Sequence, residues 1–148
     1  MTDCPFCKII AGELQGSFVF RDEICSAIMD IQPINAGHVL VLPNEHIEDL
    51  SSLTPETSSH LFLVAQSVAN AIRKSGVDCQ GINLFLADGK AAMQEVPHVH
   101  LHVIPRFEGD GFGLQFSPRY AELPTREELE NNAYHIRQAL SEFSPGNE

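Results

Sequence analysis

The chain has 148 residues, of which 43% are hydrophobic, so it can bury roughly two-thirds of its unfolded surface, and we expect a single domain over residues 1–148. Its formal net charge of −11 argues against nucleic acid polymers as partners, because binding them requires clustered Lys and Arg side chains. No apolar run approaches the roughly 20 residues that cross a bilayer, and the first ten residues lack the features of a secretory signal, so we expect a cytoplasmic protein without a membrane partner.

The N-terminal half of the chain predicts a short helical turn at residues 4–11, followed by three strands. Apolar segments flank the polar pair Asp22-Glu23, which is typical of a turn between two strands. A third apolar segment follows a loop and ends at a proline. The expected strands are residues 18–21, 24–29 and 38–43.

The second half predicts two main helices and two further strands. Thr54-Pro55-Glu56 combines an N-cap residue, a proline at the first helical position and an acidic first turn, and Gly76 is a signal for the end of this helix. An apolar stripe at helical spacing lies between them: Leu61, Val64, Ala65, Val68, Ala69 and Ile72. Thr125 to Glu128 predict a capping box for a helix over about 125–141. With strands at 82–86 and 98–104, the elements predict an α+β fold with an antiparallel sheet of about five strands.

Three histidines alternate with apolar residues in the segment PHVHLHVIPR, residues 97–106. Alternation in a strand places His98, His100 and His102 on one face of the sheet. The outer two would lie about 13 Å apart along an extended strand, which is too far to share one zinc ion. We therefore favour separate roles for the three side chains, including nucleophilic or general base catalysis. Incidental surface histidines are the alternative.

The segment His98–Ile104 resembles the signature of the histidine triad (HIT) family. Further segments resemble those of the family in the same order: Cys4–Ile10, Asp30–Pro33, Gly37–Val41, Gln94–Pro97 and Asp110–Phe112. The resemblance covers residues 4 to about 116 and implies the HIT fold. It also implies a homodimer with a continuous sheet. We expect residues 142–148 to form a flexible tail.

The resemblance implies a hydrolase or nucleotidyl transferase that acts on a small nucleotide substrate. Such enzymes cleave at the α-phosphate of nucleoside phosphoramidates or dinucleoside polyphosphates through a nucleotidyl-histidine intermediate. The implied catalytic residues are His100 as the nucleophile, His102 beside the phosphate, and His38 in support. Asp30 would bind the ribose hydroxyls, and Gln94 would lie near the substrate. Val19, Phe20 and Ile28 would form the apolar base pocket, although composition alone makes them core residues.

A second cluster of metal-binding residue types starts with the CxxC of Cys4 and Cys7. By itself this motif is half of a zinc site, a redox motif or a pair of reduced thiols. A closed structural zinc site needs four ligands. The resemblance to bacterial members of the family implies a structural zinc ion held by Cys4, Cys7, His46 and His98. In that case His98 binds metal while His100 does the chemistry.

Two positions depart from the family pattern. Ala87 stands where relatives usually carry Asn or Gln, and Met93 stands where they usually carry Gly. At a third position, that of Glu95, relatives often carry Ser or Thr. A lost phosphate hydrogen bond is worth about 1.5–3 kcal/mol. The alternative function is therefore a nucleotide-binding or protein-interaction HIT protein with weak or no turnover. A zinc-stabilised structural module is another alternative. Transfer of a nucleotidyl group to a sugar phosphate is disfavoured by His102, the third histidine of the triad.

Overall fold

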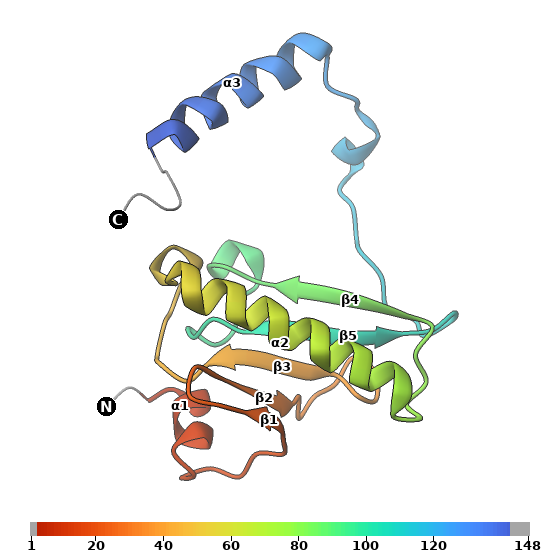
Figure 1. Ribbon diagram of the computed structural model, residues 1–148. Coiled ribbons are helices and arrows are strands. Elements are labelled where there is room, and N and C mark those ends of the chain that lie inside the picture. Colours follow the sequence, from red (N-terminus) through yellow and green to blue (C-terminus); the bar gives the residue numbers. More distant parts are fainter. Residues whose placement is uncertain (1–2, 143–148) are drawn as a thin grey trace. The chain divides into compact units, whose positions relative to one another are not determined.

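Five strands form one antiparallel sheet in the computed structural model, which describes residues 3–142 (Figure 1). The strands are β1 (Phe18–Arg21), β2 (Cys25–Met29), β3 (Val39–Pro43), β4 (Gly81–Leu86) and β5 (Leu101–Arg106). Their order across the sheet is β1-β2-β3-β5-β4, so the histidine-bearing strand lies between β3 and β4. All four neighbouring pairs are antiparallel, and the expected fold class is confirmed.

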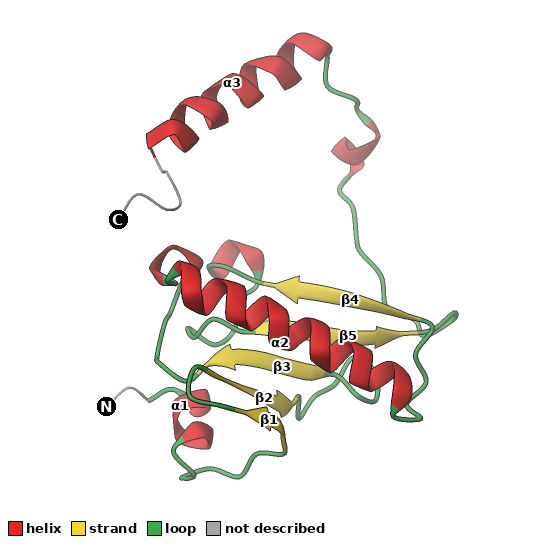
Figure 2. Cartoon of the chain, viewed as in Figure 1, coloured by secondary structure: helices red, strands yellow, loops and turns green. Residues whose placement is uncertain are grey.

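The helices are α1 (Pro5–Ile10), α2 (Pro55–Lys74) and α3 (Arg126–Glu142), with short 3-10 turns at Leu50–Ser52, Lys90–Ala92 and Pro118–Ala121. Helix α2 begins as predicted, because the Thr54 side chain accepts the N–H of Thr57 at 3.1 Å and Pro55 occupies the first turn. All six residues of the predicted apolar stripe are buried. This stripe lays α2 across one face of the sheet (Figure 2).

The two faces of the sheet carry separate hydrophobic clusters. Val39 and Val41 of β3 pack with the stripe of α2, whereas Leu40 and Leu42 pack with Phe6 of α1 on the other face. Alternate residues of a strand point to opposite faces, so β3 is apolar throughout because both of its faces are covered. The apolar members of the triad segment lie on the α2 side: Val99, Leu101 and Val103. The histidines between them therefore belong to the face that α1 covers.

The start of the histidine-bearing strand differs from the prediction. Strand β5 begins at Leu101 rather than at His98. The N–H of Val99 donates to the carbonyl of Ile47 at 2.7 Å instead of to a neighbouring strand. The β3–β5 register, in which Val41 faces Leu101, would bring Pro43 opposite Val99, and proline has no N–H to continue the ladder. The predicted alternation of faces nevertheless holds through this segment.

Residues 112–142 belong to a second compact unit, distinct from the one that contains the sheet. Its helix α3 has the predicted capping box: the Thr125 hydroxyl accepts the N–H of Glu128 at 3.2 Å, and the Glu128 carboxylate accepts the N–H of Thr125 at 2.7 Å. Its apolar side chains Leu129, Ile136 and Leu140 are exposed. The expected single domain stays a prediction; of the expected tail at 142–148, Glu142 ends α3 and the rest lies outside the described residues. Within the described part of the chain, no helix has the length and apolar character of a membrane span.

Candidate functional site

Four histidines lie close together on the α1 face of the sheet. His98, His100 and His38 are buried, with exposed fractions of 0%, 5% and 1%, and His102 is partly buried. The ring centroids of His100 and His102 are 4.9 Å apart, and those of His38 and His102 are 5.1 Å apart. The structure therefore brings together all three predicted catalytic histidines, although His38 comes from a distant part of the chain.

Backbone contacts decide which ring nitrogen of His98 carries the proton. Its Nε2 lies 2.9 Å from the carbonyl oxygen of Pro43, which can only accept a hydrogen bond, so Nε2 is the donor. The lone pair of the neutral ring is then on Nδ1. Burial, and secondarily the nearby His46 and His100, lower the pKa of His98, which keeps the ring neutral at pH 7.

The same reasoning leaves Nε2 of His100 without a proton. Its Nδ1 lies 2.7 Å from the main-chain oxygen of His98 and must donate to it. In the neutral ring the lone pair is therefore on Nε2. The edge of the ring packs against Phe6, at 5.1 Å between centroids, which fixes its orientation. Phe6 lies between the two cysteines of the CxxC motif, and no feature of the sequence alone marks it as a neighbour of His100.

A chain of hydrogen bonds runs from the main chain through His38 to His102. The N–H of Ile34 donates to Nδ1 of His38 at 3.1 Å, so Nε2 of His38 carries the proton and donates to Nδ1 of His102 at 2.8 Å. The remaining nitrogen of His102, Nε2, therefore carries the proton of that ring. The directions of these bonds follow from the N–H of Ile34, which can only donate.

Both of these rings are neutral at pH 7. Burial lowers the pKa of His38, and His100 lowers it further, although Asp30 acts in the opposite direction. Burial, followed by the proximity of His100 and His38, lowers the pKa of His102 to about 4. Oδ2 of Asp30 is 3.6 Å from Nε2 of His38, but a neutral ring makes this a dipolar contact rather than an ion pair.

Asp30 and His38 face each other where β2 ends and β3 begins, because the N–H of Asp30 donates to the main-chain oxygen of His38 at 3.0 Å. Oδ1 of Asp30 also accepts the N–H of Gln32 at 2.8 Å. The predicted ribose ligand is thus placed next to the histidines. Phe85 of β4 is a further neighbour, since it faces His102 in the register and their ring centroids lie 5.7 Å apart. Only the strand pairing, and no local motif, identifies Phe85.

The predicted apolar base pocket is divided between the core and the surface. Ile28 is buried in the cluster with Phe6 and Leu40, whereas Val19 and Phe20 on the edge strand β1 are 47% and 39% exposed. The structure therefore gives Ile28 a core position and leaves Val19 and Phe20 accessible.

Gln94 anchors the loop before the triad. Its side-chain oxygen accepts the N–H of Gly89 at 2.8 Å, and its amide donates to the carbonyl of Glu48 at 2.8 Å. Met93, one residue before it, has a φ of 67° and occupies the left-handed region that favours glycine. The position at which family members usually carry Gly therefore keeps a glycine-like backbone here, although its residue is methionine. Ala87, at the other departure, is 3% exposed and has no side-chain donor.

The predicted zinc ligands form a compact cluster. The four ligand atoms of Cys4, Cys7, His46 and His98 all lie within 4.8 Å of one another. Sγ of Cys7 is 3.3 Å from Nδ1 of His46, and Nδ1 of His98 is 3.5 and 3.6 Å from the sulfurs of Cys4 and Cys7. Tetrahedral zinc with ordinary bond lengths separates sulfur and nitrogen ligands by about 3.5 Å. The residues present therefore fit a closed zinc site.

Outer partners orient both imidazoles of this cluster. Nε2 of His46 is 3.4 Å from a carboxylate oxygen of Glu48, and Nε2 of His98 donates to Pro43. Metal-binding histidines usually use their second nitrogen in this way. All four cysteines of the chain are free thiols, including Cys25 and Cys79 outside the cluster.

Known proteins share both the sequence and the fold. Residues 11–109 match the HIT domain family. The protein hit of Bacillus subtilis is 37% identical over 140 residues, which cover 94% of this chain and 95% of that protein. The adenylylsulfatase HINT3 of Arabidopsis thaliana is 33% identical over 138 residues, covering 93% of this chain and 70% of that protein.

Solved structures of related proteins have the same fold as this chain. A HIT family protein from Bacillus anthracis superposes with a TM-score of 0.83 at 43% identity, covering 93% of this chain and 96% of that one. A zinc-bound histidine triad family protein from Mycobacterium smegmatis superposes with a TM-score of 0.72 at 38% identity, covering 93% of this chain and 97% of that one. Together with the match over residues 11–109, these likenesses establish that the chain belongs to the HIT domain family.

Proposed function

We propose that the chain is a nucleotide hydrolase or nucleotidyl transferase that cleaves nucleoside phosphoramidates or dinucleoside polyphosphates at the α-phosphate. The observation that carries this proposal is the hydrogen bond from Nδ1 of His100 to the His98 carbonyl, which leaves a lone pair on Nε2. The likeness to the Arabidopsis protein named adenylylsulfatase supports an enzyme of this general kind and adds adenylyl sulfate to the substrates worth testing.

In the proposed reaction, Nε2 of His100 attacks the α-phosphorus. The N–P bond forms while the bond to the leaving group breaks, and the leaving group departs with the electron pair of that bond and takes up a proton from solvent. Positive charge then develops on the imidazole, and the His98 carbonyl, which accepts the Nδ1 hydrogen, stabilises it. Water next attacks phosphorus and loses a proton to solvent, the N–P bond breaks with its electron pair returning to Nε2, and the nucleoside monophosphate is released with His100 restored.

His102 supplies a hydrogen-bond donor in this proposal. Because Nδ1 of His102 accepts from His38, the proton of the neutral ring is on Nε2. Because the pKa of His102 is about 4, its ring is neutral at pH 7. The Nε2–H of this neutral ring can donate a hydrogen bond to a phosphate oxygen or to the leaving group. Asp30, next to His38, would accept hydrogen bonds from the ribose hydroxyls, with Gln94 holding the adjoining loop.

Arg106 is not a free phosphate ligand, because its guanidinium is paired with Asp110 and with Asn83. We therefore assign the binding of the phosphate oxygens to hydrogen bonds from the histidine donors and from backbone N–H groups of the loop at 88–97. Val19 and Phe20 are accessible to a nucleotide base, and Ile28 would support them from the core.

We also propose a structural zinc ion held by Cys4, Cys7, His46 and His98. The fit of their spacing to tetrahedral geometry supports it, as does the likeness to the zinc-bound mycobacterial protein. Such an ion would cross-link the N-terminal segment to the segment that carries the triad. Zinc binding requires reduced thiols, which suits the proposed cytoplasmic location.

A homodimer with a continuous sheet is a further part of the proposal. Strand β4 is at the edge of the sheet, and its Leu84 and Phe85 are 40% and 39% exposed. An exposed edge strand with apolar side chains suits pairing with a second copy.

The second candidate function is a nucleotide-binding or protein-interaction protein with weak or no turnover. It is favoured by Ala87, which offers no hydrogen bond to phosphate, and by Met93, whose side chain is 74% exposed where relatives usually carry glycine.

Release of AMP from adenosine 5′-phosphoramidate, diadenosine tetraphosphate and adenylyl sulfate separates the two functions. We expect release by the wild type and none by His100→Ala, with His135→Ala, an exposed histidine of α3, as the matched control. Nucleotide binding without release from any of the three would favour the binding protein.

A further inference from the structure

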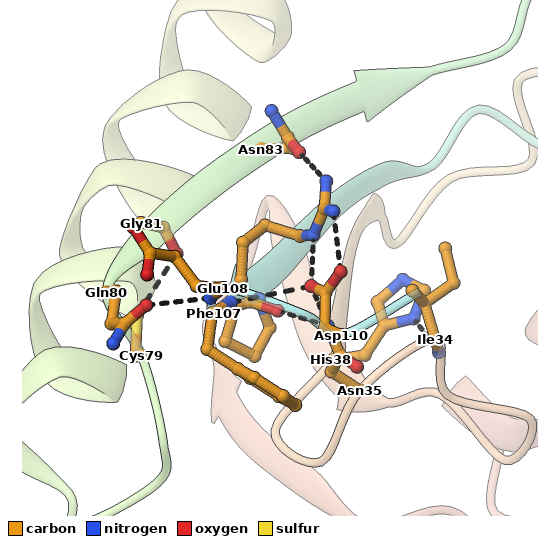
Figure 3. A network of polar contacts seen from close by, with 12 residues as sticks. Ile34, Asn35, His38, Cys79, Gln80, Gly81, Asn83, Phe107, Glu108 and Asp110 are labelled. Carbon is orange, nitrogen blue, oxygen red and sulfur yellow. Dashed lines mark hydrogen bonds and ion pairs between the residues drawn. The ribbon is translucent and has the colours of Figure 1, made fainter. Parts of the chain in front are cut away.

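A buried carboxylate lies at the end of β5. The side chain of Asp110 is 3% exposed and forms two hydrogen bonds with Arg106: Nε to Oδ2 at 2.6 Å and Nη2 to Oδ1 at 2.8 Å (Figure 3). Oδ2 also accepts the N–H of Phe107 at 3.4 Å. The Arg106 side chain is 23% exposed, and a pair of this kind adds little net stability, because desolvation of the carboxylate offsets the attraction of the charges.

Asn35 connects this carboxylate to the segment that precedes His38. Its side-chain amide donates to Oδ2 of Asp110 at 2.8 Å and to the carbonyl of Pro105 at 2.9 Å (Figure 3). Its main-chain oxygen accepts the N–H of His38 at 3.1 Å. Asn35 is thus attached to the end of β5 through its side chain and to His38 through its backbone.

The segment has little room to move. Gly37 has a φ of +90°, and a Cβ added there would lie 2.8 Å from Val77 and 3.4 Å from Pro105. The backbone therefore lies directly against these side chains, and only glycine fits. The side-chain bonds of Asn35 and the close packing at Gly37 therefore both hold the main chain of Ile34 to His38 in its position.

That position determines the direction of the hydrogen bonds in the site. The N–H of Ile34 donates to Nδ1 of His38, which makes Nε2 of His38 a donor to His102. If the Ile34 N–H moved away, either nitrogen of His38 could carry the proton. With the proton on Nδ1, His102 would have to donate through its own Nδ1, and its Nε2 would lose the hydrogen.

We propose that Asn35 and Asp110 are positioning residues that act through Ile34 and His38 to keep the proton of His102 on Nε2. This inference rests on the proposed function, in which that N–H donates a hydrogen bond to the phosphate or the leaving group. Arg106 serves the arrangement by neutralising and orienting Asp110.

The test is the tautomeric state of the histidines in the full-length chain, read from nitrogen-15 shifts of labelled imidazoles. We expect wild type to show one tautomer for His38 and His102, and Asn35→Leu, which removes the amide at similar volume, to show a mixture for both. Asp110→Asn, which weakens the acceptor without changing its size, should give a smaller shift and serves if Asn35→Leu does not fold. Gln80→Ala removes a hydrogen bond to Glu108 in the same turn and should leave both tautomers unchanged.

Turnover gives a second readout. We expect Asn35→Leu to lower kcat for AMP release by about tenfold or more, as for the loss of one hydrogen-bond donor to developing charge, with KM changed much less. Unchanged tautomers in a folded Asn35→Leu, or an equal effect of Gln80→Ala, would overturn the inference. The shifts are measured without substrate, so they decide this inference even if the wild type releases no AMP, which would contradict the proposed function alone.

Discussion

The main-chain oxygen of His98 accepts the Nδ1 hydrogen of His100 at 2.7 Å, while the ring of His98 turns its Nδ1 toward Cys4 and Cys7. One residue therefore belongs to two sites: its side chain to the cysteine cluster and its carbonyl to the proposed nucleophile. The backbone carbonyl gives His100 its reactive tautomer, so anything that moves the main chain at His98 affects the lone pair on Nε2 of His100.

Loss of the cysteine cluster should reduce both stability and turnover. We expect the wild type to contain one zinc ion per chain and Cys7→Ser to contain none, with a free energy of unfolding lower by about 3 kcal/mol or more. AMP release should fall as well, because the main chain at His98 is no longer held in place by the metal site. Metal analysis and denaturant unfolding measure these effects. Cys79→Ser, a thiol outside the cluster, is the control, and equal zinc content in the two variants would contradict the assignment.

Acid should destabilise the chain through His102. Its pKa is about 4 in the folded chain because of burial, His100 and His38, and about 6.5 in an unfolded chain. Between these values the unfolded state binds a proton that the folded state does not, so the free energy of unfolding falls as the pH drops from about 6.5 to about 4. The lowered pKa of His38 acts in the same direction.

The effect of His102 can be isolated by comparing wild type with His102→Gln in denaturant unfolding at pH 7, 5.5 and 4.5. The difference in stability between the two should shrink by about 2–3 kcal/mol toward the acid end, at about 1.4 kcal/mol per unit of pKa shift. Parallel pH curves for the two proteins would show that His102 titrates normally.

Met93→Gly should stabilise the chain. The φ of 67° at Met93 is strained for a residue with a Cβ, and its side chain is 74% exposed, so few contacts are lost. After allowance for the greater freedom of glycine in the unfolded state, we expect a gain of about 1 kcal/mol in thermal or denaturant unfolding. Ala91→Gly, in the 3-10 turn before Met93, should instead lower stability. A loss of stability in both variants would contradict the strain at Met93.

Much of the fold could be predicted from local patterns. The apolar stripe of α2 is buried as predicted, and the capping box at Thr125 forms its hydrogen bonds as predicted. Both patterns could be read from the spacing of residues within one helix. The start of β5 could not be predicted, because it depends on where Pro43 falls in the register of a neighbouring strand. Alternation in the sequence predicts which side chains of a segment share a face of the sheet. It does not predict which backbone groups the segment forms hydrogen bonds with.

The candidate site, like the fold, could be predicted only in part from the sequence. The triad motif and the family resemblance singled out the five histidines and the two cysteines that the structure brings together. They did not identify the tautomers, which depend on backbone atoms of Ile34, Pro43 and His98. They gave no role to Asn35 or Asp110, since an Asn in a loop and an Asp after a strand are ordinary residues until their 2.8 Å contact is known.

The most direct measurement is mass spectrometry of the chain quenched in alkali within its first turnovers of adenosine 5′-phosphoramidate or diadenosine tetraphosphate. We predict an adenylyl group on His100 that disappears as AMP is released, with no adduct and no release in His100→Ala. Undiminished release by His100→Ala, or an adduct on another residue, would contradict the nucleophilic role of His100.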